Sequence, residues 1–446
     1  MVRAREVSPV ELVRAHLDQI AAQRERINAF ASVLEDEALE AARLAEDAVA
    51  RGEPRGILNG VPLTVKDTFD LEGRPTLAGS RLRAGHRAAQ DATAAARLKA
   101  EGAILLGKTN CPEFASSYET DNYVTGRTNN PWNPERTPGG SSGGEAAAIA
   151  AFCSAGGVGS DAGGSIRVPA HFCGICGLKP TPGRVSIAGH VPAAAHPASL
   201  FAAAGPMARS VRDVRLLFAA LAGYDHRDPL SAPVPLRPPG AVSRIGIMEQ
   251  FGRAPVDPEI REAVLAAGRM LEMLGYIVEP FETRGLERAP NLWAFFHGPL
   301  LTPFLRRMIE GRESDAHWTL TENLQAAGLQ PGAAEVVENL AARDAMRAAL
   351  LRRMEQTPLM LMPPCGITAF PHRARRFAIG AAEIGLFQAM MPATPWNLLG
   401  LPALVLPFAL SAERLPIGVQ IVGRPWEEET LLEIGVRLGE ARGPIQ

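Results

Sequence analysis

The chain has 446 residues, of which 46% are hydrophobic and 21% are charged, so it can bury a large core and is not disordered in bulk. This length allows two or three domains, or one large α/β domain. A formal net charge of −2 provides no basic field, which argues against nucleic acid or an anionic membrane as the main partner.

The first elements in chain order are two helices. Ser8, Pro9 and Glu11 form the pattern of a capping box with proline at the first helical position. A second helix is predicted over residues 35–51, with Gly52 as its C-terminal stop. We expect the two helices to form an N-terminal helical hairpin within residues 1–56.

Several features indicate the compartment. The opening sequence MVRAREVSPVELV lacks the apolar segment and cleavage site of a secretory signal. Five cysteines are an odd number for a disulfide framework and fit a reducing environment. Residues 185–208 carry no Asp, Glu, Lys or Arg, but two histidines and three prolines interrupt them, so they predict a buried irregular segment and no membrane span. We therefore expect a cytoplasmic protein.

From residue 57 onward, strand and helix patterns alternate. Short apolar runs predict strands at residues 61–65, 104–106, 244–248, 276–278, 359–362, 404–408 and 418–422. Helices are predicted from Asp91, acting as the N-cap, to about Gly102, and over residues 258–274 and 428–439. The alternation predicts one α/β/α layered domain, residues 1–446, on a large mixed β-sheet. Its parts would be a core at 57–225, a surface loop at 226–242 and a mostly helical cap at 285–390.

Two Gly/Ser loops lie close together in the sequence, GGSSGG at residues 139–144 and GGS at residues 163–165, and each precedes a stretch that can start a helix. Glycine lets the backbone approach a ligand closely. Helix N-termini add unpaired N–H donors and a partial positive charge. The two loops are therefore suited to a site where an oxyanion develops.

Other motifs compete with this interpretation. A P-loop needs G-x-x-x-x-G-K-[ST], and no lysine follows either loop. Residues 157–162 match the dinucleotide pattern G-x-G-x-x-[GA], but the acidic residue expected about 20 positions later is missing. Residues 140–144 match the G-x-S-x-G of α/β-hydrolases, yet they lie too early for a long preceding sheet. Cys173 and Cys176 form a C-x-x-C, but no second pair or histidine partner follows at zinc spacing, and the nine histidines form no i, i+4 pairs, so no metal is expected.

The stretch 139–180 resembles the core of the amidase signature family. Its PGGSSGG and DAGGSIR blocks place Ser141 and Ser165 24 residues apart, as in that family. Upstream, GVPLTVKDTFD carries Lys66 at the position of the family's lysine. Further matching blocks, which extend the resemblance over nearly the whole chain, are GKTN, NPWN, CGLKPTPGRVS, GPMARSVRD and LPIGVQIVGR.

The resemblance implies a serine amidase that hydrolyses a carboxylic amide C–N bond through a Ser-Ser-Lys triad and an acyl-enzyme intermediate. Ser165 would attack, Ser141 would relay the proton and Lys66 would be the base. It also implies a cis peptide at Ser141, no cofactor, and a loop held in place by Asp161 and Arg167. The oxyanion hole would consist of backbone N–H groups from Ala162, Gly163, Gly164 and Ser165.

Lysine as the base sets a physical condition. Lys66 is one of only four lysines among 46 basic residues, and lysine, unlike arginine, can be neutralised by burial. Its pKa must fall by about three units for it to be neutral near pH 7. Asp67 would oppose this if it paired with Lys66. Because neighbouring side chains on a strand point to opposite faces, we expect the two to be separated.

We expect a small-molecule amide as the substrate. The sequence indicates its chemical class but does not identify the amide. In relatives, the position of Ala115 lines the pocket. Trp396, Phe387 and Met391 favour a hydrophobic acyl or aryl pocket, although core packing explains the same residues equally well. These residues favour a stand-alone amidase acting on small, hydrophobic or aryl amides.

The alternative is the glutamine-hydrolysing A subunit of a tRNA-dependent amidotransferase, which needs partner subunits. Such subunits usually carry an acidic residue upstream of an N-L-A-G-L-P block, whereas residues 390–402 here read MMPATPWNLLGLP. A degenerate fold used only for binding is disfavoured because all three triad positions are intact. Members of the family are often dimers, so the resemblance allows a homodimer, but the sequence does not determine the oligomeric state.

Overall fold

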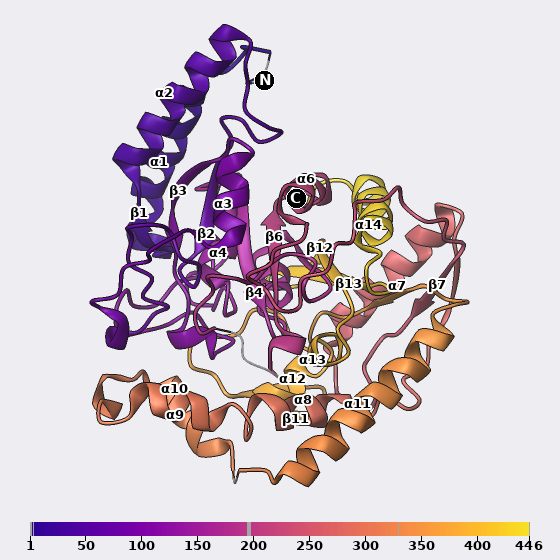
Figure 1. Ribbon diagram of the computed structural model, residues 1–446. Coiled ribbons are helices and arrows are strands. Elements are labelled where there is room, and N and C mark those ends of the chain that lie inside the picture. Colours follow the sequence, from indigo (N-terminus) through magenta and orange to yellow (C-terminus); the bar gives the residue numbers. More distant parts are fainter. Residues whose placement is uncertain (1, 3, 194–197, 329, 446) are drawn as a thin grey trace.

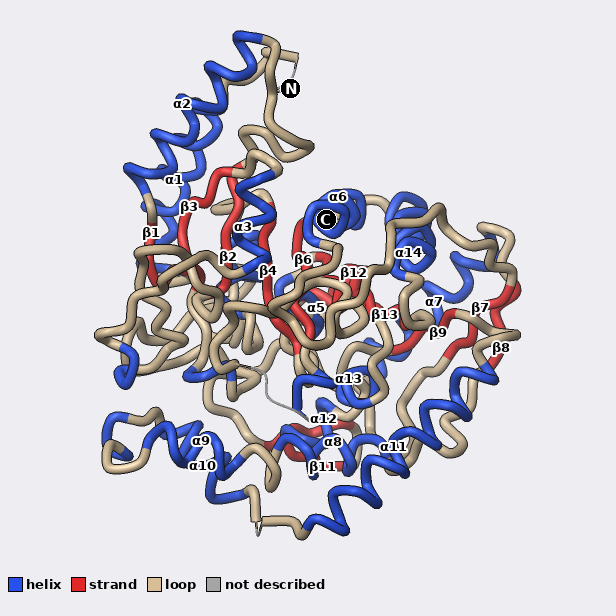
Figure 2. The backbone as a smooth tube through the Cα atoms, viewed as in Figure 1, coloured by secondary structure: helices blue, strands red, loops and turns tan. Residues whose placement is uncertain are grey.

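The computed structural model describes residues 2, 4–193, 198–328 and 330–445. Its centre is an eleven-stranded sheet with the strand order β1-β3-β2-β4-β6-β5-β12-β13-β9-β7-β8 (Figure 1 and Figure 2). Some neighbours, such as β2 and β3, run parallel and others, such as β12 and β13, run antiparallel. The expected large mixed sheet is therefore confirmed.

The strands of this sheet are β1 (Phe30–Val33), β2 (Pro62–Lys66), β3 (Ile104–Thr109), β4 (Gly156–Asp161), β5 (Cys176–Lys179), β6 (Ala203–Ala208), β7 (Arg244–Ile247), β8 (Ile277–Pro280), β9 (Leu359–Met362), β12 (Ala403–Leu410) and β13 (Pro416–Val422). A separate two-stranded sheet consists of β10 (Arg376–Ile379) and β11 (Ala382–Gly385).

The helices before β7 are α1 (Pro9–Ile27), α2 (Glu35–Arg51), α3 (Thr93–Ala100), α4 (Gly143–Ala150), α5 (Arg167–Cys173) and α6 (Val211–Leu221). Those after it are α7 (Pro258–Met273), α8 (Ala289–His297), α9 (Thr302–Ile309), α10 (Trp318–Ala326), α11 (Ala333–Arg353), α12 (Leu386–Met390), α13 (Thr394–Leu398) and α14 (Glu428–Arg442). The predicted helices at 258–274 and 428–439 are therefore present, and no helix or strand interrupts the predicted loop at 226–242.

Helices cover both faces of the sheet, as the α/β/α prediction requires. One face packs against α3, α6, α7 and α14, and the other against α1, α2, α4, α5, α8, α11 and α13. Alternation divides the side chains of β2 between the two: Leu63 and Val65 join the first cluster, while Thr64 and Lys66 point toward α4 and the loop before it. The side chains of chemical interest therefore emerge on the α4 face.

The two N-terminal helices begin and end close to the residues that the sequence predicts. Ser8 forms the predicted capping box with Glu11, and Gly52 ends α2 with φ 78°. Between the helices, however, residues 30–33 form β1, which pairs antiparallel with β3 at the edge of the sheet. This strand was not predicted, because only its pairing with residues about 75 positions later distinguishes it from a loop.

Three central strands, β4, β5 and β6, were also missed because glycine and alanine replace the expected bulky apolar residues. Their small size is required by close packing. A Cβ on Gly157 would lie 2.0 Å from Glu145 Oε1, and one on Gly205 would lie 2.0 Å from the Leu178 carbonyl oxygen. These strands therefore carry no apolar run that a sequence pattern could detect.

Two other expectations need correction. Asp91 does not cap α3: Ala92 is the N-cap residue, and the Asp91 carboxylate instead accepts from Glu72 N at 2.9 Å and pairs with Lys99 at 2.8 Å. The region 285–390 is not helical throughout, because three strands separate α11 from α12. Of these, β9 is buried on both faces and belongs to the main sheet, and β10 and β11 form a hairpin.

The described part of the uncharged stretch 185–208 is mostly buried or half-buried, with Ala193 exposed. Val185 and Phe201 are buried and β6 occupies its last part, whereas His196 and Pro197 lie outside the described residues. Within the described part of the chain, no helix combines the length and the apolar character needed to cross a membrane.

A buried ion pair between Asp67 and Lys108 gives a test of the fold. Their charged atoms lie 2.8 Å apart, and the two side chains are 4% and 0% exposed. Lys108→Met leaves the Asp67 carboxylate without its partner, so we expect a loss of about 3–5 kcal/mol in the free energy of unfolding. The matched control Arg269→Met removes one side of an exposed pair, and we expect a change within about 0.5 kcal/mol. Urea denaturation measures both, and equal effects of the two variants would contradict the prediction.

Candidate active site

Lys66 ends β2 and is completely buried. Its Nζ lies 2.6 Å from Ser141 Oγ and 3.0 Å from Ser160 Oγ. Burial lowers the pKa of Lys66 from 10.5 to about 8, and nearby acidic groups oppose the shift only in part. Lys66 therefore meets much of the physical condition for a base near neutral pH.

The carboxylates closest in sequence or space to Lys66 bind other partners. Asp67 turns to Lys108, as expected from strand alternation. Glu145 on α4 accepts hydrogen bonds from threonine hydroxyls of β2 and β3 at 2.5 and 2.6 Å, and burial raises the pKa of Glu145 to about 7. Neither carboxylate is hydrogen-bonded to Lys66 in the described part of the chain, so neither holds a proton on the amine by direct contact.

Ser141 lies in the loop before α4 and follows a cis Gly140–Ser141 peptide. The backbone is tightly packed there, because a Cβ on Gly140 would lie 2.5 Å from the carbonyl oxygen of Ser117. Ser142 N donates to Ser165 O at 3.1 Å. This bond joins the two Gly/Ser loops that the sequence singled out.

Asp161, the last residue of β4, organises the second loop. Its carboxylate accepts from the backbone N–H groups of Gly164 at 2.7 Å and Ile166 at 3.1 Å, and it pairs with Arg167 at 3.0 Å. Burial alone would raise the pKa of Asp161, but the Arg167 guanidinium outweighs it and holds the pKa well below its ordinary value. The ionised carboxylate therefore fixes the loop, in the role expected for this pair.

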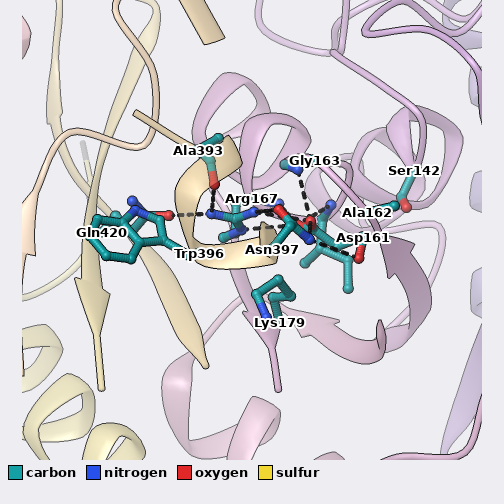
Figure 3. Close-up of polar contacts among 12 residues, drawn as sticks. Ser142, Asp161, Ala162, Gly163, Arg167, Lys179, Ala393, Trp396, Asn397 and Gln420 are labelled. Carbon is teal, nitrogen blue, oxygen red and sulfur yellow. Dashed lines mark hydrogen bonds and ion pairs between the residues drawn. The ribbon is translucent and has the colours of Figure 1, made fainter. Parts of the chain in front are cut away.

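Arg167 extends the same network into the C-terminal part of the chain (Figure 3). Its guanidinium donates to Ala393 O and Gln420 Oε1, both at 2.8 Å, and to Asn397 Oδ1 at 2.5 Å. All of these groups are buried. The loop is thus attached to α13 and β13, which lie more than 220 residues later in the sequence.

Two aromatic side chains hold the carbonyl groups of the loop. Trp293 Nε1 donates to Ala162 O, and Tyr118 OH donates to Gly163 O, each at 2.7 Å. Ala162 C=O and Gly163 N–H belong to the same trans peptide and point in opposite directions. Because Trp293 binds the carbonyl oxygen, the Gly163 N–H faces away from Trp293. Trp293 also stacks on His297, with ring centroids 4.4 Å apart. The sequence did not reveal Tyr118 or Trp293, because no local motif marks residues so far from the loop.

The four backbone N–H groups expected to act together are not equivalent. Gly164 N–H is bound by the Asp161 carboxylate at 2.7 Å. Those of Ala162, Gly163 and Ser165 form no hydrogen bond with any described residue. The structure therefore leaves three donors of the predicted set available.

Ser165 is half-buried between this loop and α5. Its Oγ has no hydrogen-bond partner among the described residues, so the line from Lys66 to Ser141 is not extended to Ser165 by a direct bond. Hydrogen bonds of this kind often tighten only when substrate is bound. The structure thus joins two predicted triad members directly, and the third through the backbone of its loop.

The two predicted pocket residues differ in their surroundings. Trp396 is completely buried, its Nε1 donates to Pro392 O at 2.8 Å, and its ring meets Phe251 edge-on. It is a core residue, and the pocket-lining expectation for it is wrong because the indole is enclosed on all sides. Ala115 is half-buried with φ 57° at the end of a short 3-10 helix, and its pocket role stays a prediction.

Metal-binding side chains are not gathered in this site. In residues 4–193, 198–328 and 330–445, no group of three His, Cys, Asp or Glu side chains could hold a metal ion. The five cysteines are buried free thiols.

Comparisons with known proteins match this α/β/α fold to amidases. A family model described as Amidase matches residues 11–432. Over 469 aligned residues the chain is 36% identical to the A subunit of the glutamyl-tRNA(Gln) amidotransferase of Chloroflexus aurantiacus, covering 97% of this chain and 93% of that protein.

Two solved structures are similar over almost the full length. The first is described as "An unexpected vestigial protein complex reveals the evolutionary origins of an s-triazine catabolic enzyme" (TM-score 0.91, 30% identity, 99% of this chain and 97% of that one). The second is 6-aminohexanoate cyclic dimer hydrolase complexed with substrate (TM-score 0.88, 30% identity, 99% and 95%). The fold and the matching family define an amide hydrolase. This chain belongs to the amidase signature family.

Gly163 provides a test of the loop geometry. A Cβ there would lie 2.3 Å from Trp293 Cζ2, so Gly163→Ala must displace the loop or the indole. We expect a fall of about 10- to 1000-fold in kcat with the melting temperature nearly unchanged, since misplaced loop donors stabilise an oxyanion poorly. Gly332→Ala is the matched control, because a Cβ there would meet no described atom within 4 Å and the φ of this residue is −73°. Full activity of Gly163→Ala would show that the close packing is not needed.

Proposed function

We propose that this hydrolase cleaves carboxylic amides with Ser165 as nucleophile, Ser141 as proton relay and Lys66 as base. The contact of 2.6 Å between Lys66 Nζ and Ser141 Oγ carries the proposal. A serine hydroxyl is a weak nucleophile until a base removes its proton. A pKa of about 8 instead of 10.5 makes the neutral amine about 300-fold more abundant at pH 7.

In the proposed reaction, Ser165 Oγ attacks the amide carbonyl carbon while its proton passes to Ser141 Oγ and the Ser141 proton passes to Lys66 Nζ. The C–N bond breaks as the leaving amine takes a proton back along this line, which leaves an ester on Ser165. Water then attacks the ester with the same groups removing its proton, and the acid is released. The carbonyl oxygen would be stabilised by three N–H groups, those of Ala162, Gly163 and Ser165.

The triad is tested by three variants on one panel of amides: glutamine, short aliphatic amides, anilides and long-chain acyl amides. We expect Ser165→Ala to lower kcat by about 10⁴-fold or more, because the nucleophile is lost. We expect Lys66→Ala to lower it by about 10²- to 10⁴-fold, because the base is lost. Ser243→Ala, at an exposed surface serine, is the control and should match the wild type. Turnover that survives Ser165→Ala would disprove the assignment.

The pH profile tests the state of Lys66. Its pKa lies below the ordinary value, at about 8, and only the neutral amine can accept a proton. The profile of kcat/KM should therefore rise with pH and level off above about 8, with a tenfold loss per pH unit well below it. Stopped assays from pH 6 to 10 measure the midpoint. A profile that is flat across this range, or that falls through pH 8 as pH increases, would contradict Lys66 as the base.

The substrate class has two candidates. The surroundings of Ser165 favour an apolar or aryl amide on a stand-alone enzyme: Tyr118 and Trp293 line the loop, and Phe387 lies parallel to Trp293 with ring centroids 6.5 Å apart. Met390, in the stretch where an amidotransferase A subunit would carry its acidic residue, is completely buried in an apolar cluster. Aromatic walls with few charges suit apolar ligands.

Glutamine hydrolysis within an amidotransferase is the second candidate, and the sequence comparison favours it more strongly than the first. The observation is the 36% identity to the A subunit of Chloroflexus aurantiacus over 97% of this chain. On this proposal the chain acts with partner subunits. For both candidate functions, the cytoplasmic location and the possible homodimer remain predictions.

One experiment separates the candidates. The purified chain is assayed on glutamine and on an anilide, alone and after co-expression with the other subunits of an amidotransferase. Anilide turnover by the chain alone, with no glutaminase activity in either preparation, supports the stand-alone amidase. Glutaminase activity that appears only with the partner subunits supports the amidotransferase role and rejects the first candidate.

A further inference from the structure

A second line of hydrogen bonds starts at Lys66 and does not include Ser141. Lys66 Nζ lies 3.0 Å from Ser160 Oγ, and Ser160 Oγ lies 2.9 Å from His190 Nε2. The line ends at Pro192, whose carbonyl oxygen lies 3.1 Å from His190 Nδ1. It contains no carboxylate, so it differs from the Ser-His-Asp arrangements in which a negative charge stabilises a protonated base.

The direction of these bonds follows from their last member. A carbonyl oxygen only accepts, so His190 Nδ1 must carry the hydrogen that it donates to Pro192. In a neutral imidazole the other nitrogen, Nε2, then has a free lone pair. Burial, assisted by the nearby Lys66, lowers the pKa of His190 to about 3, so the ring is neutral near pH 7. The Ser160 hydroxyl therefore donates its hydrogen to His190.

This direction decides what Ser160 can do for Lys66. A hydroxyl has one hydrogen, and that of Ser160 is directed to His190, so Ser160 can only accept from Lys66. One N–H of the neutral amine is then directed at Ser160, and the nitrogen lone pair is free to face Ser141. If Ser160 donated to Lys66 instead, it would occupy the lone pair that must take the proton of Ser141.

We propose that His190 is a positioning residue that acts through Ser160 to direct the lone pair of Lys66 toward Ser141. The inference rests on the proposed function, in which Lys66 is the base. His190 touches neither the substrate carbonyl nor Ser165 in this scheme. Its effect is to select one of two hydrogen-bonding arrangements around Lys66.

The imidazole is fixed relative to β2. Val191 N donates to Thr68 O at 2.7 Å, and Asp70 N donates to Gly189 O at 2.9 Å. These bonds join the residues on either side of His190 to the turn that follows Lys66. The Phe69 ring meets the imidazole edge-on, with centroids 5.0 Å apart. These contacts fix the position of His190 relative to Lys66.

Other titratable groups around Lys66 do not provide this orientation. Cys111 after β3, Glu145 on α4 and Asp161 at the end of β4 act on Lys66 through space. Glu145 is bound by threonines and Asp161 by Arg167, and none of the three is hydrogen-bonded to Lys66 Nζ in the described part of the chain. Lys66 is also the charged group that acts on His190. Ser160 is thus the second hydrogen-bond partner that orients the amine.

The test compares His190→Phe with His190→Gln on the amide that the wild type turns over best. Phenylalanine keeps the ring but removes the acceptor for Ser160, whereas the side-chain amide oxygen of glutamine can replace it. We expect the single-turnover acylation rate to fall by about 10- to 100-fold in His190→Phe, with substrate affinity unchanged within about twofold. His190→Gln should restore the rate to within about fivefold of the wild type. His86→Phe, at a partly exposed histidine whose Nε2 lies 3.7 Å from Asp70 Oδ1, is the control.

A double-mutant cycle with Ser160→Ala tests whether His190 acts through Ser160. We expect His190→Phe to have little further effect once Ser160 lacks its hydroxyl, so the two losses should be strongly non-additive. Additive losses, or a glutamine variant as slow as the phenylalanine variant at equal melting temperature, would overturn the inference. Wild-type acylation by His190→Phe would also overturn it.

The same series separates this inference from the proposed function. If Lys66→Ala keeps full turnover, the proposed base is wrong and the inference falls with it. If Lys66→Ala is inactive while His190→Phe acylates at the wild-type rate, only the role of His190 is rejected. Melting temperatures measured for every variant identify losses that are due to unfolding alone.

Discussion

The site depends on lowering the pKa of an amine inside the protein. Burial removes the hydration that stabilises a lysine ammonium, and this is the largest cause of the lowered pKa of Lys66. The effect would be lost if a carboxylate paired with the amine. Strand alternation prevents that by placing Asp67 against Lys108, while two threonines satisfy Glu145. The fold thus lowers the pKa of Lys66 by burying the amine and by giving Asp67 and Glu145 other partners.

A second constraint is a loop whose backbone donors are held in one orientation. Asp161 and Arg167 are both completely buried, and their charges compensate each other inside the protein. Arg167 then reaches the backbone of Ala393 and the side chains of Gln420 and Asn397, so the loop is attached to distant segments as well as to its own strand. Removing the charge of one partner would leave the other uncompensated, which explains why the two occur together.

The rarity of lysine was an informative signal. Of the four lysines, Lys66, Lys108 and Lys179 are completely buried, and only Lys99 is partly exposed. Each buried lysine has a different role. Lys66 contacts Ser141, Lys108 balances Asp67, and Lys179 lies beside the Asp161 network, where burial and Arg167 lower its pKa to about 7. In a chain that uses arginine on its surface, a lysine marks a position where a compact or neutralisable cation is needed.

The features that could be predicted from the amino-acid sequence are those that depend on neighbouring residues. The capping box at Ser8, the Gly52 stop, the apolar strands and the spacing of Ser141 and Ser165 were all readable, because capping and periodicity involve neighbouring residues. Strand alternation even predicted that Asp67 would turn away from Lys66. The other features became visible only in the folded chain. The tertiary structure showed that β4 uses glycine because α4 packs close, and that Trp396 is core. It also showed that Asp161 takes the Gly164 N–H, that Trp293 reaches Ala162 across 131 residues, and that His190 reaches Ser160 across 30. Contacts between segments so far apart leave no local pattern in the sequence, because they depend on how the whole chain packs.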